Sequence, residues 1–339
     1  MLYRGVEVNP AVSVRHVHNE TDEDSTFGDT DGQSATISLA SSMMSHIYEN
    51  GRRYHSFRAG SYFFPNDELE QERLDIIHHM TDLVLSGRLY LAPIGNNPQR
   101  ILDLATGTGI WAIDMGDKFP SAEVFGNDLS PIQPAMIPPN VRFEIDDIED
   151  DWSYKMPFDF IHCRYMATSI SNWPRLVTQA YQNLIPGGWV EFCDYDFQYR
   201  SDDGSLTPEL PMVHNQRLVV ESSRLLGREP SPGPKLKKWV QDAGFINVTE
   251  KCYPIPIGVW AKDKKLKTIG WWNRLQFLQG VEAWSMNLLT HVLGWKPEEV
   301  QVHVAYARKD AQNIHIHAYY NIYVVYGQRP DAGAWTAPI

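Results

Sequence analysis

The hydrophobic pattern changes character along the chain. Residues 1–34 are polar and acidic and carry few large apolar side chains. A segment of this composition buries too little apolar surface to fold, so we expect a mobile tail there. From residue 35 to Gly51, the apolar residues fall near one helical stripe, which predicts a helix that ends at this glycine.

A second helix is predicted between Pro65 and Gly87. Asn66 or Asp67 can cap its exposed amides, and acidic side chains fill its first turn, where the helix dipole favours them. Gly87 provides a left-handed stop. The predicted buried stripe comprises Leu69, Ile76, Ile77, Met80, Leu83 and Val84.

From Arg100 onward, strand-like and helix-like stretches alternate, which is typical of a parallel sheet covered on both faces. The predicted strands are 101–105, 122–128, 141–146, 158–164 and 189–195, with helices around 109–119 and 174–185. Later elements are a helix at 234–244, a strand near 246–255 and a last strand at 316–327. We therefore expect an α/β core over residues 100–339, a helical lid segment at 35–99, and helical insertions at about 196–234 and 259–312.

Composition and charge exclude several classes of protein. Lys and Arg number 30 against 42 Asp and Glu, a net charge of −12, which argues against a nucleic-acid partner. The three cysteines are scattered, so a disulfide scaffold is excluded and a reducing compartment fits. No apolar run reaches the length of a membrane span and no secretory signal is visible. We expect a cytoplasmic protein without membrane association, the nucleus being the alternative.

The strongest chemical signal is the glycine-rich turn in ILDLATGTGIWA. A strand that ends in small residues and opens a helix lets the backbone approach a ligand closely. Gly107, Gly109 and Ala112 also satisfy the dinucleotide fingerprint, with Asp128 as the ribose-binding acid. Two reactions therefore stay open: methyl transfer from S-adenosylmethionine (SAM) and hydride transfer with a nicotinamide.

The charge of Asp103 favours the first reaction. A carboxylate at the end of the first strand would repel a pyrophosphate, whereas it attracts the ammonium and sulfonium of SAM. Asp128 can accept both ribose hydroxyls, and Asp147 with Ile148 can bind adenine. The acidic loop at 146–151 is also suited to magnesium, but no second acidic cluster matches it, and we expect no metal site.

Together these motifs resemble class I SAM-dependent methyltransferases, and more narrowly the LaeA-like methyltransferases of filamentous fungi. The resembling stretches include YENGRRYHSFRAGSYFFPNDELEQERLD, VRFEIDDIEDDW, FDFIHCRYM and LIPGGWVEFCD. The resemblance implies a Rossmann-like seven-stranded sheet of order 3-2-1-4-5-7-6 with an antiparallel last strand, and SAM over the carboxyl ends of strands 1 and 2. It implies as cofactor-binding residues Asp103, Thr106, Gly107, Gly109, Asp128, Leu129, Asp147, Ile148 and Arg164. Ala105 departs from the pattern, because many relatives have glycine there.

Methyl transfer is an in-line displacement that depends mainly on proximity and desolvation. A base is needed only where the acceptor keeps its proton at neutral pH. The candidate bases are His162, His55 and Glu191, each of which also fits a structural role. Tyr54 and Tyr62 lie in the segment expected to cover the cofactor, where aromatic faces favour a sulfonium.

Aromatic residues of the additional helices indicate the acceptor. Trp271, Trp272, Trp284 and Trp295 fit a core or an apolar acceptor pocket. His315 and His317 share a strand face, but no third ligand at metal-site spacing accompanies them. The sequence favours a SAM-dependent methyltransferase acting on a small, largely apolar natural product in secondary metabolism. The alternatives are a LaeA-like regulator that binds SAM and acts through protein partners, and a nicotinamide-dependent oxidoreductase.

Overall fold

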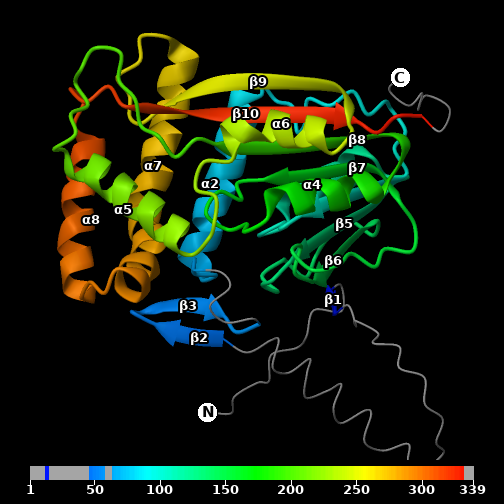
Figure 1. Cartoon of the computed structure of the whole chain (residues 1–339), viewed down its shortest axis with the longest axis horizontal. Coiled ribbons are helices and arrows are strands. Elements are labelled where there is room, and N and C mark those ends of the chain that lie inside the picture. The colour runs from blue at the N-terminus through cyan, green and yellow to red at the C-terminus, as the bar shows by residue number, and fades with distance from the viewer. Residues whose placement is uncertain (1–11, 15–45, 58–62, 332–339) are drawn as a thin grey trace, which may run out of the picture.

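The computed structural model describes residues 12–14, 46–57 and 63–331. In this part of the chain, one eight-stranded sheet forms the centre of the molecule (Figure 1). From edge to edge it contains β1 (Val12–Val14), β6 (Val141–Ile145), β5 (Glu123–Asp128), β4 (Arg100–Leu104), β7 (Phe158–Arg164), β8 (Leu184–Tyr195), β10 (Tyr319–Gln328) and β9 (Ile246–Pro256). β10 is antiparallel to both of its neighbours, and the other pairs are parallel. Without β1, this is the expected order 3-2-1-4-5-7-6 with an antiparallel last strand, so the predicted fold class is confirmed.

The additional strand β1 comes from the segment predicted to be a mobile tail. Val12–Val14 pairs in parallel with β6 from Phe143 to Ile145. β6 would otherwise be an edge strand with unpaired backbone groups, which a short Val-Ser-Val segment can satisfy. The prediction is therefore wrong for these three residues, and the rest of 1–34 lies outside the described residues.

The helix predicted to end at Gly51 is also wrong where the structure describes it. β2 (His46–Glu49) and β3 (Arg52–His55) form an antiparallel hairpin. Asn50 and Gly51 form its turn with φ of 50° and 75°, and Asn-Gly is the residue pair that such a two-residue turn prefers. The turn signal overrides the apolar stripe, and residues 35–45 lie outside the described part.

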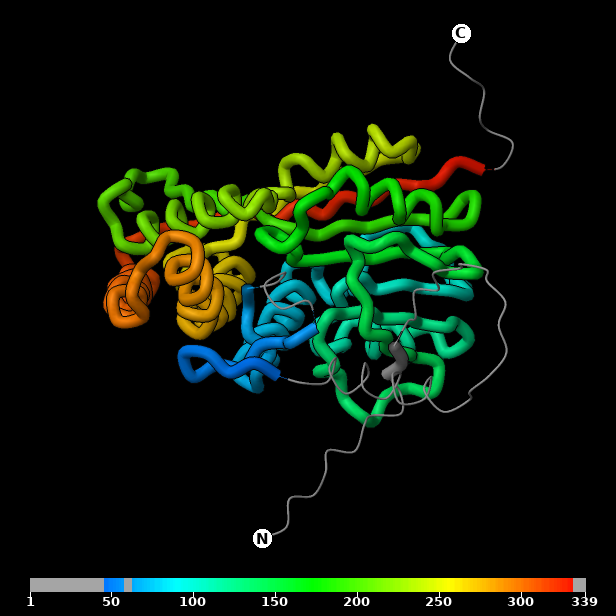
Figure 2. Tube along the Cα trace, turned by 60° about the horizontal axis from the view of Figure 1, so that its bottom comes forward, coloured from blue at the N-terminus to red at the C-terminus, as the bar shows by residue number. Residues whose placement is uncertain are grey.

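α2 (Glu68–Val84) begins where the sequence predicted. The Asp67 side chain caps it by accepting from the Glu70 N–H, and Arg52 of the hairpin forms a 2.5 Å ion pair with Asp67. Gly87 has φ of 77° just beyond the helix, as expected of a left-handed stop. The hairpin therefore lies against the start of α2 (Figure 2).

The apolar stripe of α2 is only partly buried. Ile77, Met80 and Val84 are buried, and Ile76 and Leu83 are half-buried. Leu69 is 59% exposed, so its predicted burial is wrong. The buried face in the first turns contains instead the polar pair Glu70 and Arg73.

The helices fall into two groups (Figures 1 and 2). α3 (Ile110–Lys118), α4 (Trp173–Gln182) and α6 (Gly233–Asp242) pack on the sheet and bury residues such as Trp111, Leu176 and Leu236. At the end of the sheet where the parallel strands finish lie α2, α5 (Pro211–Leu225), α7 (Lys264–Asn287), the π-helical turn η1 (Leu288–Val292) and α8 (Pro297–Gln312). α5 lies in the first predicted insertion, and α7, η1 and α8 lie in the second.

Candidate active site

The turn between β4 and α3 takes a shape that favours glycine at three positions. Ala105, Gly107 and Gly109 have φ of 52°, 61° and 79°. A Cβ on Gly109 would lie 2.4 Å from the Phe143 ring, so only glycine fits there. A cavity described below lies next to this turn, and among the described residues that line it Gly109 does not appear. Close packing against Phe143 therefore requires glycine here, and the cofactor contact that the resemblance implied stays a prediction.

Replacing Ala105 by glycine is expected to raise the free energy of unfolding by about 0.5–1 kcal/mol. The left-handed conformation costs an L residue about 1–2 kcal/mol, and glycine removes this cost. Glycine also makes the unfolded chain more flexible, which offsets about 0.5–1 kcal/mol of the gain. Urea denaturation measures the change. Ala305→Gly, on the exposed face of α8, is the matched control and should lower stability by about 1 kcal/mol. Equal losses in both variants would contradict the backbone argument.

A cavity lies over this turn, which we call the glycine-turn cavity. It is bounded by the carboxyl ends of β4, β5, β6 and β7 and by α2. The predicted cofactor residues that line it are Thr106, Gly107, Asp128, Leu129, Asp147, Ile148 and Arg164. The structure therefore brings together residues that are far apart in the sequence, at the edge where nucleotides bind in open α/β sheets.

Asp128 is positioned by the turn itself. Its Oδ2 accepts from the Gly107 N–H at 2.9 Å and its Oδ1 from the Ser130 N–H at 2.9 Å. Burial raises the pKa of this carboxyl. An ionised carboxylate has about four acceptor positions, so about two remain for a pair of hydroxyls. The geometry suits a ribose.

The segment after β6 provides the next wall of the cavity. Oδ1 of Asp147 accepts from the Glu149 N–H at 2.9 Å. Ile148 is 6% exposed, and its carbonyl accepts from the Trp152 indole N–H at 3.0 Å. A fixed carboxylate beside a packed aliphatic side chain fits an adenine, which offers an amino group and a flat apolar ring.

Asp103 lies beneath the turn and not in the cavity. Its Oδ1 is 2.7 Å from Nδ1 of His162, and its Oδ2 accepts from the Thr106 hydroxyl at 2.6 Å. The carboxylate is 3% exposed and is absent from the cavity linings found in the described chain. The predicted direct contact between Asp103 and the cofactor is corrected accordingly: Asp103 holds Thr106, which does line the cavity.

His162 is buried as well, and the structure argues against it as a base. Its ring stacks on Trp111 with centroids 3.8 Å apart and planes 7° apart. Burial lowers its pKa, so the neutral ring donates from Nδ1 to Asp103. His162 lines neither described cavity. It supports the turn through Asp103.

Glu191 is likewise a structural residue. Its Oε2 accepts from the backbone N–H groups of Leu91 and Ala92, both at 2.7 Å. The side chain is 1% exposed and outside both cavity linings in the described chain. The structure therefore does not support its predicted role as a base. Glu191 instead holds the 91–92 segment against β8 through these two hydrogen bonds.

Glu191→Gln is expected to flatten the pH dependence of stability. Burial raises the pKa of Glu191 to about 7 from 4.5, so the folded protein binds the proton more tightly than the unfolded chain. Stability from this group is thus full below pH 4.5 and falls as the pH rises to about 7. Gln can accept both bonds without a charge. Denaturation at pH 5 and pH 8 should show a smaller loss in the variant, with unchanged affinity for S-adenosylhomocysteine (SAH).

A loss of stability between pH 5 and pH 8 as large in the variant as in the wild type would contradict this assignment. Asp194 is the other buried acid on this strand, and burial raises its pKa to about 7. Because its contribution has the same sign and remains in Glu191→Gln, the slope should be reduced and not abolished.

The N-terminal candidates that the structure describes, Tyr54 and His55, have side chains outside the lining of the glycine-turn cavity, although His55 lies near enough to Asp128 for its charge to act on the pKa of that carboxyl. The Tyr54 hydroxyl donates to Oδ1 of Asn287 at 3.2 Å, and burial raises its pKa to about 12. Nδ1 of His55 lies 2.6 Å from the Phe57 carbonyl. Neither side chain lines a cavity found in the described chain. Tyr62 lies outside the described residues.

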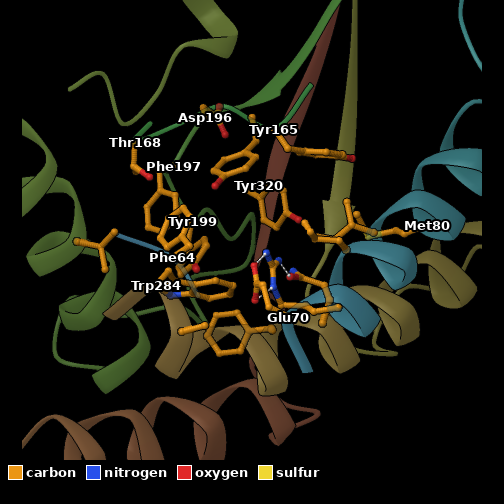
Figure 3. A pocket seen from close by; sticks show the side chains of 18 residues that line it. Phe64, Glu70, Met80, Tyr165, Thr168, Asp196, Phe197, Tyr199, Trp284 and Tyr320 are labelled. Atoms are coloured by element: carbon orange, nitrogen blue, oxygen red, sulfur yellow. Dashed lines mark hydrogen bonds and ion pairs between the residues drawn. The ribbon is translucent and has the colours of Figure 1, made fainter. Parts of the chain in front are cut away.

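A second cavity adjoins the first, which we call the aromatic cavity (Figure 3). The space between its walls amounts to about 890 Å³, part of which is open to solvent. Its aromatic walls are Phe64, Tyr165, Tyr195, Phe197, Tyr199, Phe277, Trp284 and Tyr320. Glu70, Leu74, Ile77 and Tyr165 line both cavities, so they form the junction between them.

The sequence predicted little of this second cavity. Of the tryptophans proposed for an acceptor pocket, Trp284 lines it, whereas Trp271 is 43% exposed. Tyr165 directly follows β7 with φ of 59°, and its hydroxyl is 2.5 Å from that of Thr81. A left-handed tyrosine is unusual, and residues in such strained conformations cluster at active sites and ligand clamps. In the sequence, the position of Tyr165 at the end of a predicted strand was the one feature that could have pointed to a role in the site.

The histidine pair near β10 has other partners. Nδ1 of His317 lies 2.5 Å from Oδ2 of Asp203, and its ring stacks on Trp260. In the described residues, no group of three side chains suited to a metal ion is found. In the same residues, no helix is long and apolar enough to cross a membrane.

Comparisons with known proteins agree on one family. The family model for a methyltransferase domain matches residues 76–250. Methyltransferase pytC of Aspergillus terreus is 48% identical over 312 residues, which are 92% of this chain and 96% of that protein. Secondary metabolism regulator LAE1 of Cochliobolus heterostrophus is 38% identical over 294 residues, covering 85% of this chain and 96% of that protein. The methyltransferase tdiE of Emericella nidulans, described as probable, is 36% identical over 265 residues, covering 78% and 83%.

Among solved structures, a SAM complex of a Haemonchus contortus phosphoethanolamine N-methyltransferase covers 89% of this chain and 75% of its own. At 14% identity and a TM-score of 0.47, this likeness is too weak to add to the sequence matches. The matched domain spans the glycine turn, Asp128 and the β7 end, and it excludes the nicotinamide-dependent oxidoreductase. The chain belongs to the LaeA-like family of SAM-dependent methyltransferases.

Proposed function

We propose that this methyltransferase acts on a small, largely apolar natural product of secondary metabolism. The observation that carries the proposal is the aromatic cavity, which meets the glycine-turn cavity at Leu74, Ile77 and Tyr165. Aromatic walls with charged and polar groups between them favour a largely apolar, flat acceptor of the size of a small molecule. The relatives named methyltransferase pytC and tdiE are consistent with this role.

The glycine-turn cavity has the side chains that SAM requires. Asp128 and Leu129 would hold the ribose, Asp147 and Ile148 the adenine, and the backbone at Thr106 the methionine end. When bound, SAM supplies a methyl group on a positively charged sulfur. These assignments follow from the donor set, since carboxylates accept from hydroxyl and amino groups.

The resemblance implies that Arg164 lies near the sulfonium edge of SAM, but its charge suits a different part of the molecule. Its guanidinium donates to Nδ1 of His78 at 2.8 Å, and Nε2 of His78 is 3.0 Å from Oδ2 of Asp114. A fixed positive charge repels a sulfonium but binds a carboxylate. We therefore assign Arg164 to the methionine carboxylate, and we assign the aromatic face near the sulfonium to Tyr165.

The helices at the carboxyl edge would exclude water from the reaction. α2 contributes Glu70, Leu74 and Ile77 to both cavities, and α7 contributes Phe277 and Trp284 to the aromatic one. We propose that these helices form the lid of the site. Excluding water and holding the acceptor close to the methyl group would supply most of the acceleration.

A second candidate function rests on the regulators among the relatives. LAE1 is a named secondary metabolism regulator and is 38% identical to this chain. In this alternative, the protein binds SAM and acts through protein partners in the nucleus, whereas the small-molecule enzyme would act in the cytoplasm. The aromatic cavity favours the enzyme, because a concave site walled by aromatic side chains suits a small molecule better than a protein surface.

The two functions predict different destinations for the methyl group. Protein and methyl-tritiated SAM are incubated with an extract of the producing organism, and label is then counted in the organic-soluble and acid-precipitated fractions. We expect label in the organic fraction, and clearly less with an Asp128→Ala control when the SAM concentration lies below the wild-type Kd. Label confined to precipitated protein would contradict the small-molecule proposal and support the regulatory one.

A further inference from the structure

Glu70 is the charged side chain at the junction of the two cavities. It lies on α2, lines both cavities and is 3% exposed. Its Oε2 accepts from Nε of Arg73 at 2.9 Å, and its Oε1 from Nη2 at 2.5 Å. Figure 3 shows Glu70 below Tyr320 and beside Trp284. A buried ion pair therefore projects among aromatic rings at the place where donor and acceptor would meet.

Other polar side chains near the aromatic cavity form hydrogen bonds and ion pairs with other groups of the protein. Gln276 and Tyr320 both donate to Oδ1 of Asn273, each at 2.8 Å. Asp196, the other acid in the aromatic cavity, forms a 2.7 Å ion pair with Arg200 and accepts from the Asn321 N–H. These groups build the wall and do not lie at the junction.

Glu70 keeps room for a ligand. A carboxylate has about four acceptor positions, and the two bonds from Arg73 use about half of them. The remaining positions can only accept a hydrogen bond. A ligand group that meets Glu70 must therefore donate one, and a charged acceptor makes such a bond about twice as strong as a neutral one.

We infer that Glu70 binds a hydroxyl of an aromatic acceptor at this junction and receives its proton during methyl transfer. The inference rests on the proposed function and adds the acceptor's chemical class, a phenol or enol. As the acceptor oxygen bonds to the methyl carbon, the sulfur–methyl bond breaks with its electron pair left on sulfur. The oxygen becomes strongly acidic at that moment, so its proton passes to the Glu70 carboxylate.

The same geometry favours product release. The methylated product carries an ether in place of the hydroxyl, so it has no proton to donate to Glu70. Once Glu70 has passed the proton it received on to water, the ether oxygen faces an acceptor-only carboxylate, which is a repulsive contact. The junction therefore discriminates between acceptor and product by one hydrogen bond.

The experiment compares 2-naphthol with 2-methoxynaphthalene, which have the same ring system and differ in the donor. Calorimetry on the SAH-saturated protein should show 2-naphthol binding at least about 10-fold more tightly. In Glu70→Gln the two affinities should lie within about 2-fold. Glu72→Gln, at an exposed position of the same helix, is the matched control and should keep the wild-type preference. Melting temperature and SAH affinity check that each variant is folded.

Each outcome decides between the inference and the function on which it rests. Equal binding of both probes to the wild type, or a preference that survives in Glu70→Gln, would overturn the role of Glu70 and leave the aromatic cavity in place. Failure of both probes to bind would contradict the apolar acceptor site itself. A crystal structure with 2-naphthol tests the claim without any variant: its oxygen should lie within hydrogen-bond distance of Glu70, and a different position refutes the inference.

The proton transfer has its own test in the tritium assay. Glu70→Gln should lower organic-soluble label at least about 100-fold, the size of a general-base effect, while SAH affinity stays within about 2-fold. Undiminished label would refute the base role. Label equally absent with the wild type would count against the proposed function.

Discussion

Replacing Asp103 by alanine is expected to lower the free energy of unfolding by about 3 kcal/mol, because two hydrogen bonds to a buried carboxylate are lost together. The His162 Nδ1–H and the Thr106 hydroxyl both donate to Asp103, at 2.7 and 2.6 Å. His162 is 2% exposed, so its N–H would remain buried without a partner. Urea denaturation at pH 7.5 measures the change.

Two further variants separate the parts of this effect. Thr106→Val removes one of the two bonds and should cost about 1 kcal/mol. Asp117→Ala, on the exposed side of α3, is the control and should leave the free energy of unfolding nearly unchanged. If Asp103→Ala kept full stability and lost only SAH affinity, Asp103 would be a direct cofactor ligand, and its assignment beneath the turn would be wrong.

Replacing Asp128 by alanine is expected to weaken SAH binding by about 1–3 kcal/mol, or about 5- to 150-fold, because charge-assisted bonds to the ribose hydroxyls are lost. The carboxylate lines the cavity and is already oriented by the Gly107 and Ser130 N–H groups. Calorimetry at equal ionic strength measures the affinity. Comparison with 2′,3′-dideoxy SAH isolates the hydroxyl contacts.

The dideoxy ligand serves as the internal control for that measurement. Wild type should discriminate strongly between SAH and the dideoxy form, whereas Asp128→Ala should bind them almost equally. A variant that keeps the full preference for the hydroxylated ligand would show that another group binds the ribose. The Asp117→Ala protein should again match the wild type.

The sequence predicted the sheet because its strands are regular. A hydrophobic strand directly followed by a helix is predicted at 101–119 and at 158–185, and both match parallel units of the structure, β4–α3–β5 and β7–α4–β8. The cofactor residues could be predicted for the same reason. Asp128 and Arg164 end their strands and Asp147 follows one closely, and the carboxyl ends of parallel strands meet at one edge of the sheet.

The errors arose where partners far apart in the sequence decide the structure. Asp103 and His162 appear independent in the sequence, but β4 and β7 are neighbours and place them opposite each other. Glu191 could not be distinguished from a catalytic acid until the 91–92 backbone was seen to donate to it. The sequence does not show which groups a buried polar residue bonds to. Those partners determine whether the residue stabilises the fold or takes part in the reaction.

The residues around the aromatic cavity, where the acceptor would bind, were the hardest to predict from the sequence. Glu70 resembles a surface acid in the first turn of a helix, where the dipole favours it. Its burial follows from packing of α2 against α7, which brings Gln276 and Trp284 to Arg73. Tyr165 likewise gains its role from a backbone φ of 59° that no local pattern predicts.

The central claim is that donor and acceptor cavities meet at one junction, and a crystal structure with bound SAH tests it most directly. The account predicts the ribose on Asp128, the adenine beside Ile148, and the sulfur facing the junction formed by Leu74, Ile77 and Tyr165. A sulfur atom directed away from the aromatic cavity, or a nucleoside bound outside the glycine-turn cavity, would contradict it.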